Sequence, residues 1–207
     1  EDSDIFVPPS PGADPLLAVL RQNPQSAPLQ AAAGEFRKAA ELLKSQIAVS
    51  NFQHLKQLFV DAYTLNKMRT QTLPHGPGYQ LQLKVQGGLP LLPVSLSSME
   101  QLTKRGVDLT TKGEFSEALK IFREALRSVP MCAVISTQEQ KKLQQLIAKT
   151  VEYITAMRIE IERKKLVAAQ ADPVRIAELA CLMTLCNMED AHKFLAYKSA
   201  FTLLYKM

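Results

Sequence analysis

The sequence predicts a mostly α-helical chain, built as an α-solenoid of antiparallel helix pairs with one short β-hairpin. Apolar residues recur at helical spacing through most of residues 29–207, whereas apolar and polar residues alternate strictly only near residues 79–86. In addition, the tripeptide Gly–Glu–Phe opens two of the helical patterns, at residues 34–36 and 113–115. This recurrence indicates a repeated helical unit.

Residues 1–28 precede the first helical pattern and differ from it in composition. They hold six of the chain's 12 prolines, and residues 1–33 contain four acidic residues and a single arginine. Proline is excluded from helix interiors and central strands, so we expect an extended, acidic, proline-rich linker. Residues 29–207 are expected to form one α-helical scaffold domain.

Helical spacing predicts two helices before the hairpin and five after it. Two segments of capping-box form, Ser98–Gln101 and Ser136–Glu139, and the pair Asp172–Pro173 indicate where three of the later helices begin. Asn187 is expected to cap the last helix. The predicted helices cover roughly residues 29–49, 51–69, 98–112, 114–129, 136–166, 172–185 and 189–207.

The hairpin is predicted as an insertion near residues 79–96. Its first strand follows from the alternation of apolar and polar residues from Tyr79 to Val85. Gly87–Gly88 is a turn signal, and the apolar residues within 91–96 are expected to form the returning strand. Pro90 and Pro93 would confine the returning strand to a sheet edge.

The most specific pattern lies in residues 99–130, which have the spacing of a tetratricopeptide repeat. Small residues are expected where the two helices cross closely, an aromatic residue fills the gap between them, and a proline ends the unit. The predicted repeat core consists of Leu102, Gly106, Leu109, Gly113, Phe115, Ala118, Phe122, Ala125 and Pro130. A single unit of this kind cannot bury its own apolar face and must stack on neighbours.

A weaker copy of the second repeat helix occurs 79 residues earlier. There Gly34–Glu35–Phe36 is followed by Ala39 and Leu43, as Gly113–Glu114–Phe115 is followed by Ala118 and Phe122. The alternative interpretation is that two unrelated amphipathic helices share the same first residues.

Charge and cysteine content exclude several functional classes. The net charge is +5, and the basic residues are mostly spread singly along helical patterns, with one compact group at Arg163–Lys165. This distribution is typical of a solvated helix face, with an acidic partner or a membrane surface as the alternative. No nucleic-acid reading motif accompanies the charge. The three cysteines are odd in number and lie in or beside apolar helical patterns, which fits a reduced compartment. The cysteines and histidines lack zinc spacing, so we expect no metal and no cofactor.

Beyond the general repeat pattern, the chain resembles the C-terminal region of the alpha subunit of coatomer, the COPI vesicle coat. The strongest match lies in residues 109–130, and the next lies in residues 152–166, which include Glu152–Tyr153–Ile154, Glu160 and Arg163–Leu166. Weaker support comes from Lys56–Phe59, Arg175–Ile176 with Glu178, and Cys186–Asn187 with His192. The likeness covers roughly residues 31–206.

The resemblance implies a structural segment of the COPI coat that binds the coatomer epsilon subunit, a tetratricopeptide-type solenoid, and other coatomer subunits. It implies support of Golgi-to-ER retrograde and intra-Golgi vesicle transport. The location would be cytoplasmic, on Golgi membranes and COPI vesicles through the coat alone, since no apolar stretch approaches the ~20 residues of a membrane span. Members of that family continue beyond the last helix here, so we expect the chain to be shortened at its C-terminal end.

The expected partner surface consists of large apolar residues that a short helical stack cannot cover: Leu119, Ile121, Phe201, Leu204 and Tyr205. The alternative function is a peptide-binding adaptor of the co-chaperone kind, whose groove needs about three stacked repeats. An enzyme is disfavoured, because the sequence has no phosphate-binding glycine loop, nucleophile elbow or paired-histidine metal helix. Asp190 and His192 are two positions apart on a predicted helix, so we expect no catalytic pair from them.

Overall fold

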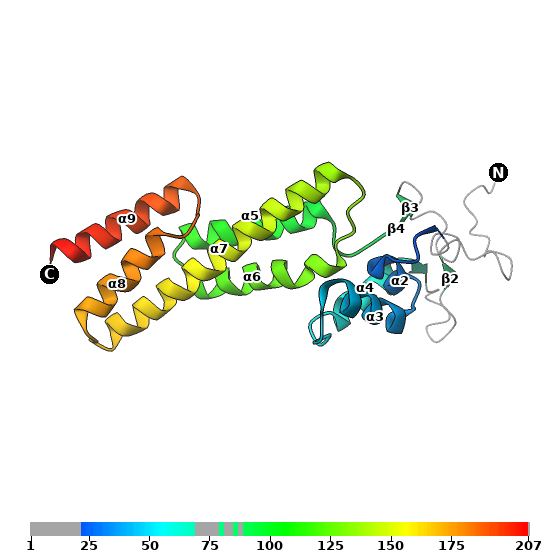
Figure 1. Ribbon diagram of the computed structural model, residues 1–207, viewed down its shortest axis with the longest axis horizontal. Coiled ribbons are helices and arrows are strands. Elements are labelled where there is room, and N and C mark those ends of the chain that lie inside the picture. Colours follow the sequence, from blue (N-terminus) through cyan, green and yellow to red (C-terminus); the bar gives the residue numbers. More distant parts are fainter. Residues whose placement is uncertain (1–21, 69–78, 81–84, 87–88, 207) are drawn as a thin grey trace. The chain divides into compact units, whose positions relative to one another are not determined.

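The computed structural model describes residues 22–68, 79–80, 85–86 and 89–206 (Figure 1). Two compact units share these residues. The first lies within residues 1–95 and takes in residues 128–133, and the second consists of residues 96–127 and 134–207. The predicted linker falls largely outside the described residues.

Within the described residues, helices dominate, which confirms the mostly α-helical fold class. The first unit contains α2 (Ala27–Ala32), α3 (Phe36–Ile47), α4 (Lys56–Leu65) and the short 3₁₀ helix η1 (Val129–Met131). The second contains α5 (Leu96–Thr111), α6 (Phe115–Ser128), α7 (Thr137–Ala168), α8 (Pro173–Thr184) and α9 (Asp190–Tyr205).

The first unit departs from the sequence prediction at Gly34. A single helix over residues 29–49 is wrong, because the chain turns between α2 and α3 and Gly34 adopts a φ of +91°. Glycine tolerates this conformation without steric cost. A Cβ atom at Gly34 would also lie 2.7 Å from the Tyr63 ring, so the turn packs directly onto α4. Buried residues of all three helices form the core: Leu29, Ala31, Ala39, Leu43, Phe59 and Ala62.

Two antiparallel pairings of two residues each are described between α4 and α5. Strand β1 (Lys67–Met68) pairs with β2 (Tyr79–Gln80), and β3 (Val85–Gln86) pairs with β4 (Leu89–Pro90). The predicted hairpin includes residues 81–84 and 87–88, which lie outside the described residues.

The returning strand predicted for residues 91–96 is wrong. Residues 91–95 lie outside any strand, and Leu96 is the first residue of α5. The side chain of Asn66 explains this, because it accepts a hydrogen bond from the Leu91 N–H at 3.0 Å and donates one to the Leu91 carbonyl at 2.7 Å. These two bonds hold the backbone of Leu91 against the end of α4, and β4 ends one residue earlier, at Pro90.

The capping signals predicted for the second unit are confirmed at two of four positions. Ser136 accepts a hydrogen bond from the Glu139 N–H at 3.2 Å, and Asp172 accepts one from the Val174 N–H at 3.0 Å. By contrast, α5 begins two residues before Ser98, so Ser98–Gln101 lies inside the helix. The predicted cap at Asn187 is wrong as well, because Glu189 is the N-cap of α9 and the Asn187 side chain accepts from Lys193 instead.

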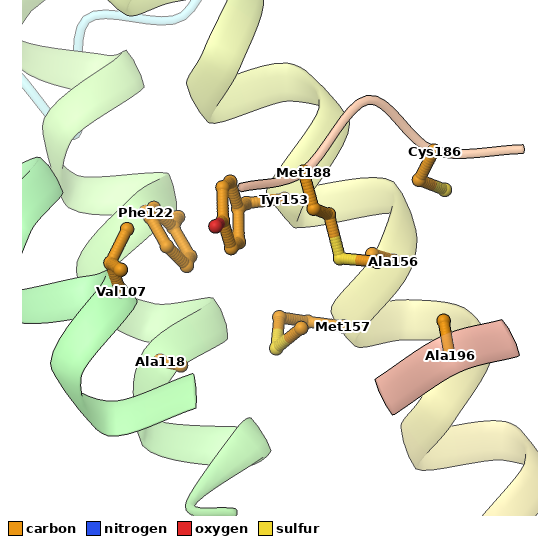
Figure 2. Packing of buried hydrophobic residues seen from close by; sticks show 9 residues of the cluster. All are labelled: Val107, Ala118, Phe122, Tyr153, Ala156, Met157, Cys186, Met188 and Ala196. Atoms are coloured by element: carbon orange, nitrogen blue, oxygen red, sulfur yellow. The ribbon is translucent and has the colours of Figure 1, made fainter. Parts of the chain in front are cut away.

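The core of the second unit is built around α7, the longest helix (Figure 1). Helix α7 contacts α5 and α8, and α8 packs against α9. Figure 2 shows the buried cluster, in which the rings of Phe122 and Tyr153 are stacked with centroids 5.0 Å apart. Its members come from α5, α6, α7, α9 and the segment before α9: Val107, Ala118, Phe122, Tyr153, Ala156, Met157, Cys186, Met188 and Ala196.

Candidate partner-binding surface

The predicted repeat core is organised by the contact between Gly106 on α5 and Phe122 on α6. A Cβ atom at Gly106 would lie 2.6 Å from Cε1 of Phe122, closer than real contacts allow, so the ring fills the space that the missing side chain leaves. Ala118, Phe122 and Ala125 are fully buried. Leu109 and Phe115 pack against this core while remaining partly exposed. Leu102 is half-buried on α5, and Pro130 lies in η1 of the first unit.

The two Gly–Glu–Phe turns have the same backbone hydrogen bonds. The Gly34 N–H donates to the Ala31 carbonyl and the Glu35 N–H to that of Gln30, each at 3.0 Å. The Gly113 N–H donates to the carbonyl three residues before it, and the following amide to the carbonyl five residues before it, again at 3.0 Å. Both glycines have a positive φ, so the sequence copy corresponds to a copy of local structure.

The five residues of the predicted partner surface divide into two groups. On α9, Phe201, Leu204 and Tyr205 are exposed by 71%, 54% and 84%, and the rings of Phe201 and Tyr205 stack with centroids 6.2 Å apart. On α6, Leu119 packs against the core and Ile121 is half-buried. The free apolar area therefore lies on α9 rather than on α6.

Sequence reasoning missed the N-terminal half of this surface. Phe194 and Tyr197 on α9 are exposed by 67% and 57%. Together with Phe201 and Leu204 they follow spacings of three, four and three residues, which places all four on one helix face. This spacing was available in the sequence, but the prediction used only the last turns of the helix.

An apolar groove adjoins this face between α8 and α9. Its volume is about 640 Å³, and Leu204 is shared between the groove and the exposed face of α9. The groove wall is formed mainly by α8, through Val174, Arg175, Ala177, Glu178, Cys181, Leu182, Thr184 and Leu185. Arg175 and Glu178 form an ion pair with 2.7 Å between Nη1 and Oε2. The other residues that line the groove are largely apolar.

His192 belongs to a buried hydrogen-bond network that sequence reasoning did not find. Its Nδ1 lies 2.8 Å from the Tyr153 hydroxyl on α7, and its Nε2 lies 3.0 Å from Thr111 Oγ1 at the end of α5. Burial lowers the pKa of His192, against the opposing effect of Glu189. Burial raises the pKa of Tyr153 to about 12. Both groups are therefore neutral at pH 7, and they connect three helices.

The compact basic group at Arg163–Lys165 is engaged within the unit. Arg163 donates to both carboxylate oxygens of Glu160, at 2.7 and 2.6 Å, and this pairing raises the pKa of Arg163. Lys165 pairs with Glu162 at 3.5 Å. The Lys164 ammonium lies 4.3 Å from the centroid of the Phe115 ring. The two ion pairs lie within α7, and the contact between Lys164 and Phe115 joins α7 to α6.

Among the described residues, no three His, Cys, Asp or Glu side chains are grouped so as to hold a metal ion. In the same part of the chain, no helix combines the length and the apolar character needed to cross a membrane.

The sequence comparisons identify the family of the chain. The whole chain, residues 1–207, matches the family model that describes the C-terminus of the coatomer (COPI) alpha subunit. The chain belongs to this family. Coatomer subunit alpha-2 of Arabidopsis thaliana is 33% identical over 214 residues, which cover 99% of this chain and 17% of that protein.

Two other coatomer alpha subunits also match nearly the whole chain. Coatomer subunit alpha of Dictyostelium discoideum is 32% identical over 207 residues and 98% of this chain. That of Saccharomyces cerevisiae is 23% identical over 205 residues and 95% of this chain. The chain spans 17% of the length of these relatives.

Several residues that carry the resemblance to coatomer alpha meet in the second unit. Phe122 stacks on Tyr153, and Tyr153 contacts His192 from a position 39 residues away in the sequence. Glu160 and Arg163 form an ion pair in which both side chains are largely buried. These segments of the family pattern thus contribute largely buried side chains to the second unit.

Proposed function

We propose that this chain is a structural segment of the COPI coat and that it binds the coatomer epsilon subunit. In this role it supports Golgi-to-ER retrograde and intra-Golgi vesicle transport as a scaffold rather than as an enzyme. Membership in the coatomer alpha C-terminus family supports the coat assignment. Contacts with other coatomer subunits, in the cytoplasm and on Golgi membranes and COPI vesicles, are part of the same proposal.

The observation that carries the binding role is the exposed apolar face of α9. Phe194, Tyr197, Phe201 and Leu204 lie on one side of the helix and remain exposed by more than half. Contiguous apolar surfaces of this kind mark sites of protein association. A lasting complex buries at least about 1,000 Å² in total, which requires a surface that extends beyond one short helix. The groove on α8 supplies such an extension.

Co-expression with the coatomer epsilon subunit tests this proposal. We expect the two chains to elute together in size-exclusion chromatography, with a mass from light scattering that equals the sum of one copy of each. An unrelated tetratricopeptide protein of similar size serves as the control and is expected to elute separately. Separate elution of the epsilon subunit at micromolar concentrations would contradict the proposed partner.

Substitutions then test the surface. Phe201→Ser combined with Tyr205→Ser removes exposed aromatic area without disturbing the buried core, so circular dichroism is expected to stay unchanged. The matched control is Ile47→Ser on α3, which is also exposed but lies in the first unit. We expect the double variant to weaken the complex and the control to leave it intact.

A further inference from the structure

We propose that the outer face of α9 and the α8–α9 groove bind an amphipathic helix of a partner protein that carries acidic residues beside its apolar stripe. This inference deepens the proposed function and rests on it, because it assigns the chemistry of the partner segment to one surface of the chain.

Helix α9 has two apolar faces. One face is covered by the rest of the second unit and includes His192, Ala196 and Ala200, which are buried. A second face carries the exposed stripe Phe194, Tyr197, Phe201 and Leu204. Its spacing of three, four and three residues is that of the a and d positions of a coiled coil, where a second helix packs. A helix that is apolar on more than one face is normally buried on each of them.

The groove makes a helix the favoured occupant over a membrane surface. It is concave, has a volume of about 640 Å³ and continues from the stripe through Leu204. Side chains that project from a partner helix can enter a groove of this kind, in the helix-in-groove mode of recognition. A bilayer presents a broad surface and would contact the ridge of α9 without filling the groove on α8.

The charged residues beside the exposed stripe indicate which residues the partner helix carries there. Lys193 and Lys198 lie on opposite sides of the exposed stripe, at positions comparable to those beside a coiled-coil seam. Asp190, at the first position of α9, is the only acidic residue of the helix. Acidic residues on the partner would therefore pair with both lysines. A second copy of this chain would bring lysines against lysines, which is unfavourable.

Two synthetic three-heptad peptides test the proposal against the full 207-residue chain. Both carry leucine at the a and d positions, and they differ only in having glutamate or lysine at the e and g positions. Fluorescence anisotropy measures the dissociation constant of each labelled peptide. We expect the glutamate peptide to bind at least about tenfold more tightly than the lysine peptide, because like charges side by side at an interface are strongly unfavourable.

Substitutions on α9 test whether the peptides bind to this helix. The combination Lys193→Glu and Lys198→Glu is expected to reverse the preference, so that the lysine peptide binds more tightly. Phe201→Ser with Tyr205→Ser is expected to weaken both peptides, whereas Ile47→Ser in the first unit leaves both dissociation constants unchanged. Circular dichroism establishes that each variant is folded. Equal affinity for the two peptides, or a preference that survives the charge reversal, overturns the proposal.

Two further measurements distinguish the other occupants that this surface could have. If neither peptide binds and the chain instead binds vesicles containing phosphatidylserine through Phe201 and Tyr205, the occupant is a membrane and the proposal is wrong. If the mass in solution doubles on concentration and Phe201→Ser abolishes the increase, the occupant is a second copy and the proposal is again wrong.

The epsilon subunit is measured in parallel, so that the two proposals can fail separately. Failure of the epsilon subunit to bind the wild-type chain overturns the proposed function, whatever the peptides do. If the epsilon subunit binds but the peptides show no charge preference, the proposed function stands and the assignment of an acidic helix to α9 falls.

Discussion

The hydroxyl of Tyr153 lies 2.8 Å from Nδ1 of His192 and thereby connects α7 to α9. Thr111 donates its hydroxyl proton to the Val107 carbonyl at 3.1 Å, so its oxygen accepts from the His192 Nε2–H. Nδ1 is then the acceptor for the Tyr153 proton, and the Tyr153 oxygen accepts from the Glu189 N–H at 3.2 Å. Every ring and hydroxyl proton in this network has an acceptor.

We expect Tyr153→Phe to lower the free energy of unfolding by about 1–3 kcal/mol, because it leaves both the His192 Nδ1 and the Glu189 N–H without this partner. Urea denaturation followed by circular dichroism measures the change. Tyr197→Phe removes a hydroxyl from an exposed tyrosine of α9 and serves as the control. Equal stability of the two variants would show that the network contributes little.

The same network predicts a loss of stability in mild acid. Burial lowers the pKa of His192 in the folded chain below its ordinary value of 6.5, so the unfolded chain takes up the proton first as the pH falls. The stabilisation is therefore complete above pH 6.5 and is lost as the pH falls through the folded-state pKa. Protonated Nδ1 would also face the Tyr153 hydroxyl as a second donor.

Thermal unfolding between pH 7.5 and 5 tests this dependence. We expect the midpoint of the wild-type chain to fall more over this range than that of His192→Gln, which has no imidazole to protonate. Because carboxylates contribute to acid sensitivity as well, the difference between the two chains is the relevant quantity. His54→Gln changes an exposed histidine of the first unit and is expected to behave as wild type. Parallel pH profiles for wild type and His192→Gln would contradict the prediction.

Local patterns in the sequence predicted the features that depend on neighbouring residues. The Gly–Glu–Phe turns, the cap at Ser136 and the close approach at Gly106 each follow from residue type and short spacing, and the structure shows these local arrangements. The bond between Asn66 and Leu91 spans 25 residues, and that between Thr111 and His192 spans 81. Periodicity carries no information about such pairs, so the missing strand and the buried histidine were not predicted.

The partner surface was predicted in part for a related reason. The apolar residues at the end of α9 were recognised from composition, but whether Leu119 and Ile121 are free depends on which helix packs against α6. The structure places Leu119 against the core. Sequence alone gives the apolar faces of a helix, and the tertiary arrangement decides which of them remains open.

We expect Gly106→Ala to destabilise the chain by about 1–3 kcal/mol, because the added methyl group would overlap the ring of Phe122. Phe122→Leu creates space at the same contact and is destabilising by itself. Since the two residues touch, the double variant is expected to lose less than the sum of the single losses.

Gly113→Ala separates this steric effect from backbone strain. Nothing lies within 4 Å of a Cβ atom at Gly113, but its φ of +79° is unfavourable for alanine. We expect a loss of about 1–2 kcal/mol that is independent of Phe122→Leu. Strict additivity for Gly106→Ala and Phe122→Leu in urea denaturation would contradict the proposed contact.

Ala118 and Ala39 test whether the two Gly–Glu–Phe helices are structural copies. Both alanines are fully buried four residues after the glutamate of their turn, and each donates its N–H to that glutamate's carbonyl, at 2.9 and 3.0 Å. Leucine at either position would overpack the helix contact, so we expect Ala118→Leu and Ala39→Leu each to cost about 1–3 kcal/mol. Ala148→Leu, on the exposed side of α7, is the control and is expected to be close to neutral. The measurement is the thermal midpoint of each variant. An unchanged midpoint for Ala118→Leu would contradict the repeat assignment, and a loss confined to Ala118→Leu would show that the earlier helix shares the turn of the repeat without its tight crossing.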